Sequence, residues 1–317
     1  MPHAWKQTID INENIARELI NSQHHITIET IILLDEGWDN LVYLVNGNII
    51  FRFPRRELGV ICMQNEILLL PYIAKQVSFK FSVPHWVGQP SDLYPYPFSG
   101  YNMLSGESLC DAATTLINNN SFILTLASWL KELHSIPVNN DYVKSIKGNQ
   151  EWRFDVNHRV MRCEQNINQY EEYFLQAGFQ RQTIFDVIEF IRSLKFKNLK
   201  KSFLHGDLYS RHIIVSPQTL MPVGLIDWGD VHVGHPGIDL AVGMIFDDEA
   251  FRIFLETYNE IDDETITIML FHAFCHSMSF LPYAYEQNKE SLMRWGRMTL
   301  NRSIIEIIKL QDRKKLY

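Results

Sequence analysis

Two short polar motifs on either side of a predicted β-hairpin constrain the fold of this 317-residue chain more than any other feature. The motifs are HGDLYSRH at residues 205–212 and DWGD at residues 227–230. The segment between them is apolar and is interrupted at Ser216-Pro217-Gln218, which predicts two short strands joined by a turn. Such a hairpin brings Asp207 and Asp227 to one end. Two carboxylates in one place suit phosphoryl transfer, in which one orients a hydroxyl nucleophile and the other holds Mg²⁺ on phosphates.

The composition is that of an ordinary folded protein, with 46% hydrophobic residues and a length that fits one large domain or two lobes. The formal net charge of −8 argues against a partner bound through its phosphate backbone and fits a cationic small substrate better. Four cysteines lack any C-x-x-C spacing, and no leader-like N-terminus or bilayer-spanning apolar run stands out. We therefore expect a cytoplasmic protein that binds small molecules and has no nucleic acid, membrane or protein partner.

The hydrophobic periodicity divides the chain into a strand-rich front and a helix-rich back. Residues 1–103 contain predicted helices at 11–22 and 57–74 and predicted strands at 28–34, 41–45, 49–53, 81–87 and 98–103. Asn46-Gly47 between two of these strands is typical of a hairpin turn. Residues 104–317 are predicted to be mainly helical, at 121–134, 155–176, 183–196, 236–246, 248–258, 264–287 and 289–310. This pattern predicts an α+β protein with a small antiparallel-sheet lobe and a larger helical lobe.

The two motifs are similar to the catalytic loop H-x-D-x-x-x-x-N and the metal-binding D-F-G of kinases, with His212 in place of Asn and Trp228 in place of Phe. Matching segments follow in order along most of the chain: GWDN at 37–40, IFRFPRR at 50–56, NEIL at 65–68, FSGY at 98–101, GESL at 106–109, LHSIP at 133–137 and GHPGID at 234–239. Together they resemble the aminoglycoside and macrolide phosphotransferases, the antibiotic kinases with a bilobal, protein-kinase-like fold.

This resemblance implies roles for the acids of the two motifs. Asp207 stands at the position of the catalytic base, which orients the acceptor hydroxyl. Asp227 is similar to the principal Mg²⁺ ligand, and His212 stands at the second metal-ligand position. A ring nitrogen of neutral histidine can bind a metal, so the residue types fit these positions.

The resemblance also implies that residues 1–103 form the lobe that binds ATP or GTP. Arg52 stands where many relatives have lysine, at the cation that grips the phosphates, and Glu66 resembles its helical partner. The nucleotide site is expected to include Gly37, Tyr101 and Met103 as well. Because arginine is a rigid fork and lysine a point charge, Arg52 can hold phosphate differently from lysine.

The second lobe, residues 104–317, is expected to carry the catalytic loop and the acceptor site, with Asp230, Glu151 and Asp155 facing the acceptor. An aminoglycoside-like acceptor is the first prediction, because the chain is acidic and aminoglycosides are polycations. A macrolide, a sugar and an amino alcohol are alternative acceptors. A nucleotide-binding module without catalysis is an alternative from another class. A protein kinase is disfavoured, since no A-P-E element follows the second motif.

Several other polar residues are predicted to be structural. His205 is expected to brace the catalytic loop, and Asp239 to anchor that loop by hydrogen bonds. His272 and His276, four residues apart with Cys275 beside them, are interpreted as core histidines, because H-E-x-x-H is absent and the surrounding helix is apolar.

Overall fold

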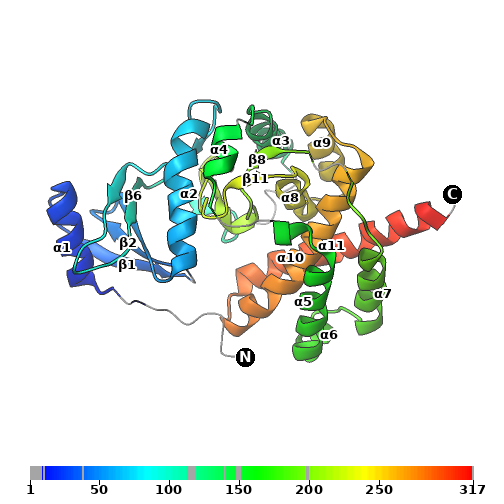
Figure 1. Cartoon of the computed structure of the whole chain (residues 1–317). Helices are drawn as coiled ribbons and strands as arrows, with labels where there is room; N and C mark the ends of the chain where they lie inside the picture. The colour runs from blue at the N-terminus through cyan, green and yellow to red at the C-terminus, as the bar shows by residue number, and fades with distance from the viewer. Residues whose placement is uncertain are drawn as a thin grey trace.

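The structure is a computed structural model that describes residue 9 and residues 11–37, 39–112, 119–138, 140–147, 151–197 and 200–315. Trp38, in the segment GWDN at 37–40, lies outside the described residues. A sheet flanked by two helices forms one end of the molecule, and a larger group of helices forms the other (Figure 1). The predicted α+β fold with a sheet lobe and a helical lobe is confirmed.

The small lobe is built on a five-stranded antiparallel sheet in the order β1-β2-β3-β6-β5. Its strands are β1 (Ile31–Glu36), β2 (Asn40–Val45), β3 (Ile49–Pro54), β5 (Trp86–Gly88) and β6 (Phe98–Asn102). Asn46 and Gly47 join β2 to β3 with φ of 51° and 73°, the left-handed conformation that such turns require. The hairpin predicted from Asn-Gly is therefore confirmed.

The two faces of this sheet have different partners, because alternate side chains of a strand point to opposite faces. Phe51 and Phe53 of β3 are fully buried in a cluster with Leu19 and Ile20 of α1 (Glu13–His24). Arg52, between the two phenylalanines, points to the opposite face, where α2 (Glu57–Ile73) lies. The sheet accordingly lies between α1 and α2 in Figure 1.

The strand predicted over residues 81–87 is two separate strands, and this prediction was wrong. Pro84 has no N–H to donate to a sheet, and the strand is interrupted around it. β4 (Lys80–Phe81) leaves the small lobe and pairs in parallel with β10 (Pro222–Leu225). That sheet has the order β4-β10-β9-β7, with β7 at Glu107–Ser108 and β9 at Ile213–Val215, so it ties the front of the chain to the catalytic hairpin.

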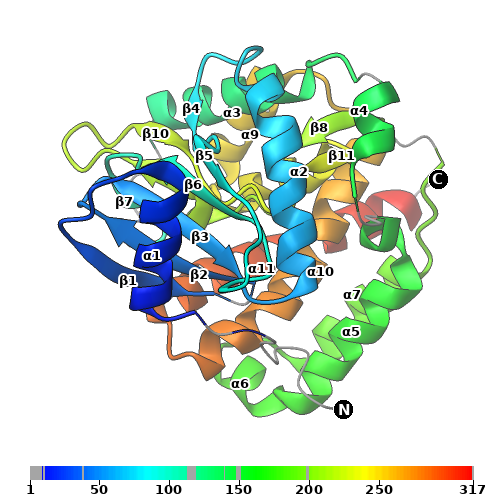
Figure 2. The same ribbon diagram turned by 60° about the vertical axis from the view of Figure 1, so that its left-hand side comes forward.

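The larger lobe is mainly helical, as predicted. Its α-helices are α3 (Asn120–His134), α4 (Asn140–Ser145), α5 (Val156–Gln169), α6 (Glu171–Gln176), α7 (Arg181–Arg192), α8 (Gly237–Leu240), α9 (Asp248–Tyr258), α10 (Asp263–Glu286) and α11 (Glu290–Lys315). Short 3-10 helices, η2 (Glu151–Phe154), η3 (Ser210–His212) and η4 (Ala241–Ile245), and the antiparallel pair β8 (Ser202–Leu204) and β11 (His232–Gly234) complete it. α10 and α11 pack along each other in both views (Figures 1 and 2).

Several predicted helices have other bounds in the structure: the helix predicted over 11–22 is α1, that over 183–196 is α7, that over 236–246 is divided into α8 and η4, and that over 289–310 extends to the end of α11. Two further differences show a local cause. The helix predicted over 155–176 is divided at Tyr170, which ends α5 and precedes α6. The helix predicted over 121–134 begins one residue earlier, because its N-cap is Asn119, whose side chain accepts hydrogen bonds from Ser121 N and Phe122 N. Hydrophobic periodicity locates the buried face of a helix, whereas the cap depends on backbone geometry at its first turn.

α10 is long and apolar enough to cross a membrane by length and composition, alone among the described helices. The prediction from sequence that no apolar segment is long enough to span a bilayer was therefore wrong. In the structure 72% of its most apolar window is buried, by α5, α8 and α11 among others. A core helix passes the same test, so the length and composition of α10 do not by themselves indicate a membrane span.

Candidate active site

The catalytic loop is fixed to the core through one buried carboxylate. Asp239 is fully buried, and it accepts hydrogen bonds from His205 N at 2.7 Å and Gly206 N at 2.9 Å. Its Oδ2 also lies 3.2 Å from His134 Nε2. Burial alone would raise the pKa of Asp239, but these hydrogen bonds outweigh it and hold the pKa below its ordinary value. The predicted anchoring role of Asp239 is confirmed.

Gly206 sets the direction in which the loop leaves this anchor. Its φ is 86°, and a Cβ placed there would lie 2.2 Å from the carbonyl oxygen of Asp230. Only glycine fits such a position, because the conformation is left-handed and the neighbouring atom is backbone. The next residue, Asp207, therefore emerges with its side chain at the cleft, where it is 30% exposed.

The hairpin of β9 and β10 brings the second acid to the first, as predicted from the sequence. His205 Nε2 lies 2.9 Å from the carbonyl oxygen of Ile226, which joins the catalytic loop to the residue before Asp227. Asp227 itself has a φ of 60°, an unusual conformation for a residue other than glycine. Strain of this kind persists where the surrounding contacts enforce it, and it is common at functional sites.

His212 and Asp227 each place one atom, a ring nitrogen and a carboxylate oxygen, where the two can hold a cation together. His212 Nδ1 lies 2.8 Å from the carbonyl oxygen of Asp207, and since a carbonyl only accepts, Nδ1 carries a proton. In the neutral ring Nε2 then presents its lone pair, 3.3 Å from Asp227 Oδ2. A second hydrogen bond that fixes the tautomer in this way is usual for metal-binding histidines.

Arg52 connects the small lobe to the second motif. Its Nη1 donates to both oxygens of Glu66 at 2.8 and 3.0 Å, and its Nη2 donates to Asp227 Oδ1 at 2.8 Å. Tyr101 donates its hydroxyl proton to Glu66 Oε2 at 2.8 Å. Burial raises the pKa of Glu66, and the Arg52 charge and the Tyr101 hydroxyl oppose that rise. The predicted pairing of Arg52 with Glu66 is confirmed.

The two motif acids remain ionised at neutral pH. Burial opposes the charge on Asp207, but the hydrogen bond from His276 outweighs it and holds the pKa of Asp207 below its ordinary value. Burial also opposes the charge on Asp227, but the positive charge of Arg52 outweighs it and lowers the pKa of Asp227. Two ionised carboxylates can orient a hydroxyl and hold a cation without first losing protons.

The residues expected at the nucleotide lie along the small lobe in three different settings. Gly37 is in the turn between β1 and β2, where its N donates to Asn40 O at 3.0 Å. Met103 follows β6 and is 41% exposed. The Tyr101 side chain is 2% exposed and donates its hydroxyl proton to Glu66, so it contacts the ion-pair partner of Arg52.

The acids expected at the acceptor are also dispersed. Asp230 is 38% exposed, and its Oδ1 accepts a hydrogen bond of 2.5 Å from Arg153 Nη2. Burial and neighbouring carboxylates raise the pKa of Asp230 to about 6, against the opposing charge of Arg153. Asp155 is the N-cap of α5 and accepts from His158 N at 2.9 Å, and Glu151 begins η2. Asp230 is thus near enough to Asp207 for the two charges to interact, whereas Asp155 serves as the cap of α5.

The structure adds three site contacts that sequence reasoning missed. His276 Nε2 on α10 lies 3.2 Å from Asp207 Oδ1, so the interpretation of His276 as a core histidine was wrong. Arg153 neutralises Asp230, and Arg211 of the catalytic loop donates to Asp35 of β1 at 2.7 Å, across the two lobes. A polar stripe at four-residue spacing on an otherwise apolar helix was the signal for His276; the other two contacts join segments far apart in sequence.

The buried His232 next to this site predicts how stability depends on pH. Its Nδ1 donates to the Asp230 carbonyl at 2.7 Å, and its Nε2 has no hydrogen-bond partner in the described part of the chain. Burial lowers the pKa of His232 from 6.5 to about 4. Between these values the unfolded chain binds the proton and the folded chain does not, so the free energy of unfolding falls as pH falls from 6.5 to 4.

We expect His232→Asn to flatten this dependence by up to about 1.4 kcal/mol per pH unit, the limit for one proton. Asparagine keeps a donor for the Asp230 carbonyl and does not titrate. Denaturant unfolding from pH 7.5 to 4.5 measures the slope, with the exposed His85→Asn as the control. Identical slopes for wild type and His232→Asn would contradict the prediction.

Comparison with known proteins agrees with this geometry. Residues 30–268 match the phosphotransferase enzyme family. No curated protein sequence matches the chain.

Solved structures share the fold over nearly the whole chain. The GDP complex of aminoglycoside 2'-phosphotransferase-IIIa has a TM-score of 0.68 at 22% identity and covers 93% of this chain and 99% of that one. The gentamicin complex of APH(2'')-IIa has a TM-score of 0.60 at 18% identity, covering 94% and 99%. Macrolide 2'-phosphotransferase from Brachybacterium faecium has a TM-score of 0.62 at 16% identity, covering 92% and 98%.

At such identities the structures establish the fold, and the family match over three quarters of the chain establishes the relationship. The catalytic loop, the second motif and the Arg52–Glu66 pair all lie within the matched residues. The chain therefore belongs to the phosphotransferase enzyme family.

Proposed function

We propose that this phosphotransferase transfers the γ-phosphoryl group of ATP or GTP, with Mg²⁺, to a hydroxyl group of a small-molecule acceptor. The observation that carries the proposal is the convergence of four groups from three segments: β3, the catalytic loop and the second motif. Arg52 from β3 contacts Asp227, His212 faces the same carboxylate, and Asp207 stands beside His212 with one side of its carboxylate open. Phosphoryl transfer depends on positioning and charge stabilisation, which is what such an arrangement supplies.

The sheet face that carries Arg52 supports the nucleotide part of the proposal. Val42 pairs directly with Arg52, and Ile50 precedes it by two residues, so all three point to one face. Both apolar side chains are half-buried, and Ile226 before the second motif is also half-buried. A nucleoside base would find apolar contacts there, with its phosphates toward Arg52. Among the structural relatives, several are nucleotide complexes, with GDP, ADP or ATP.

The donor atoms fit a divalent cation held jointly with phosphates. Mg²⁺ typically takes one or two protein ligands and completes its shell with phosphate oxygens and water. Asp227 Oδ2 and His212 Nε2 would be the protein ligands, and the described residues contain no cluster of three or more His, Cys, Asp or Glu side chains arranged for a metal. When bound, the cation would neutralise charge on the phosphates. Arg52 would keep Asp227 oriented through Oδ1.

Arg52→Ala is expected to raise the nucleotide KM by about 10-fold or more while changing the acceptor KM much less. Loss of a charge-assisted contact to phosphate has roughly this cost. Arg52→Lys keeps the charge and should recover part of the affinity, and it controls for the unpaired Glu66 that alanine leaves behind. An unchanged nucleotide KM in Arg52→Ala would show that another cation, such as Lys75 or Arg55, holds the phosphates.

The acceptor proposed first is an aminoglycoside-like polycation, in line with the net charge of −8 and with relatives solved with kanamycin, gentamicin and streptomycin. One observation favours a macrolide-like acceptor as the second candidate. The wall beside Asp207 carries aromatic, aliphatic, histidine and hydroxyl side chains, and Asp207 is the only acid among the described residues of this wall. The nearby Asp230 is paired with Arg153.

A nucleotide-consumption screen tests the function and the acceptor class together. Aminoglycosides, macrolides, sugars and amino alcohols are each supplied with Mg²⁺ and ATP or GTP, and Asp207→Asn is the blank. Consumption above the blank with one class identifies the acceptor. Nucleotide binding without consumption above the blank, for every acceptor and for water, would favour the alternative of a binding module without catalysis.

A further inference from the structure

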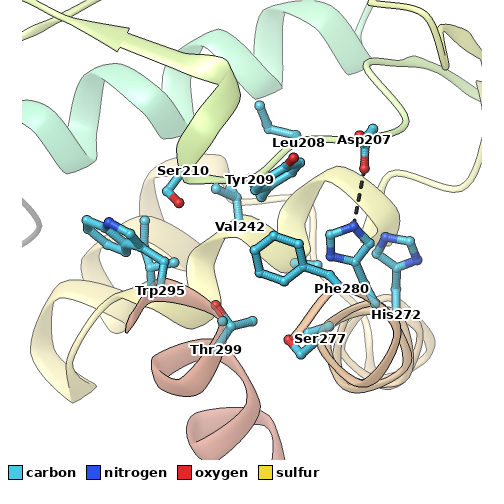
Figure 3. Close-up of a pocket in the computed structure, with 15 residues that line it drawn as sticks. Asp207, Leu208, Tyr209, Ser210, Val242, His272, Ser277, Phe280, Trp295 and Thr299 are labelled. Carbon is cyan, nitrogen blue, oxygen red and sulfur yellow. Dashed lines mark ion pairs between the residues drawn. The ribbon is translucent and has the colours of Figure 1, made fainter. Parts of the chain in front are cut away.

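His276 contacts the proposed catalytic carboxylate from a helix that is remote from it in sequence. Its Nε2 lies 3.2 Å from Asp207 Oδ1, the contact drawn as a dashed line in Figure 3. The two side chains are exposed to similar extents, 28% and 30%, so the contact lies at the cleft. A group at this place can affect which way the Asp207 carboxylate faces.

The two oxygens of Asp207 have different surroundings as a result. Oδ1 faces the ring of His276, whereas Oδ2 is 3.8 Å from His212 Nδ1, beyond hydrogen-bond distance. The Nδ1 proton of His212 is instead given to the Asp207 carbonyl at 2.8 Å. Oδ2 is consequently the oxygen left to accept a hydrogen bond from a substrate hydroxyl.

The ring of His276 is held in place by aromatic neighbours on its own helix. His272 and Phe280, four residues before and after it, stack on the ring with centroids 5.6 and 5.7 Å away and interplanar angles of 20° and 10°. Residues four apart share one face of a helix, so α10 presents these three rings as a single stack. Tyr209 of the catalytic loop packs against the same ring at 5.5 Å.

We propose that His276 is a positioning residue for phosphoryl transfer: it donates a hydrogen bond to Asp207 Oδ1 and thereby turns Oδ2 toward the acceptor hydroxyl. This inference rests on the proposed function, in which Asp207 orients the nucleophile. The neutral ring protonated on Nε2 and the imidazolium ring both supply the donor. A rigid ring on α10 fixes the carboxylate more firmly than water would. This orientation is important because the rate of such transfers depends on alignment within a small angular range.

Intrinsic hydrolysis of Mg-ATP and Mg-GTP tests the inference without an identified acceptor, since water then takes the place of the hydroxyl. Phosphate release from radiolabelled nucleotide is followed over hours. His276→Ala is expected to lower the rate by about 10-fold to 100-fold, the usual range for a hydrogen bond to a charged group, with nucleotide Kd unchanged. His276→Gln has an amide donor of similar reach and should recover most of the rate. The exposed His85→Ala, in the small lobe, should hydrolyse nucleotide as wild type does.

A double-mutant cycle shows whether His276 acts through Asp207. In the Asp207→Asn background, His276→Ala should cause little further loss, because the carboxylate that it positions is already gone. If the rate losses of the two single variants multiply in the double variant, this inference is overturned and the proposed function still stands. The same holds if His276→Gln hydrolyses nucleotide no faster than His276→Ala at equal thermal stability. Wild-type hydrolysis by Asp207→Asn would overturn the proposed function and the inference together.

Discussion

Replacing Asp227 with alanine is expected to abolish phosphoryl transfer while the protein stays folded. The carboxylate supplies Oδ2 to the proposed cation site and holds Arg52 through Oδ1. A cation on the phosphates is worth several kcal/mol of charge stabilisation, so losing its main ligand should lower transfer by about 10³-fold or more. The fold should survive, because Asp227 is 47% exposed and Arg52 keeps its two hydrogen bonds to Glu66.

The backbone of Asp227 requires a matched control. Its φ of 60° is tolerated better by asparagine than by alanine, so part of an alanine effect can come from local strain. Asp227→Asn keeps the conformation and removes the charge, and it should lose transfer almost as fully. Turnover is measured at saturating nucleotide over a titration of Mg²⁺, with thermal unfolding alongside. Wild-type turnover in both variants would exclude Asp227 as the metal ligand.

The part of this site that could be predicted from sequence is the part carried by local patterns. The hairpin of β9 and β10 follows from apolar runs around a turn, and it fixes the approach of Asp207 to Asp227. The Arg52–Glu66 pair followed from a resemblance that supplies a strand and a helix in known register, and it is present at 2.8 Å. In each case the geometry depends on two elements that follow each other directly in the chain, β9 and β10 or β3 and α2.

The contacts that sequence reasoning missed join segments whose proximity only the packed fold decides. His276 reaches Asp207 because α10 crosses behind the catalytic loop, 69 residues later in the chain, and nothing in the local pattern of α10 specifies that crossing. Arg211 and Asp35 pair across the two lobes over 176 residues. A histidine on an apolar helix fits a core position and a cleft position equally well until the neighbouring elements are placed.

The strand predicted over residues 81–87 shows a different limit of prediction from sequence. Its residues have the β-branched and aromatic character of a strand, and each half does form one. Which sheet each half joins is decided by partners elsewhere: β4 pairs with β10 of the catalytic hairpin, and β5 pairs with β6. Propensity identifies extended backbone, whereas sheet membership depends on long-range pairing.

Asp207→Asn is expected to leave nucleotide binding intact and to lower transfer by at least about 10²-fold, the low end for a positioned acid or base. The loss has a specific geometric cause in this structure. His276 Nε2 donates to Oδ1, so the asparagine oxygen will turn toward His276 and its NH₂ group will face the acceptor. A hydroxyl that must donate its proton then meets a donor, and it is turned away from the phosphorus.

The nucleotide Kd and the transfer rate separate this effect from a loss of binding. Asp207 makes no hydrogen bond to Arg52 among the described contacts, so the proposed grip on the phosphates is unchanged in the variant. The transition state is loose and the hydroxyl need not lose its proton early, so the residual rate reflects lost orientation more than lost basicity. Combining Asp207→Asn with His276→Ala removes the donor that turns the amide, and the double variant should be no slower than Asp207→Asn alone. Transfer within a few-fold of wild type in Asp207→Asn would exclude this aspartate as the residue that orients the acceptor.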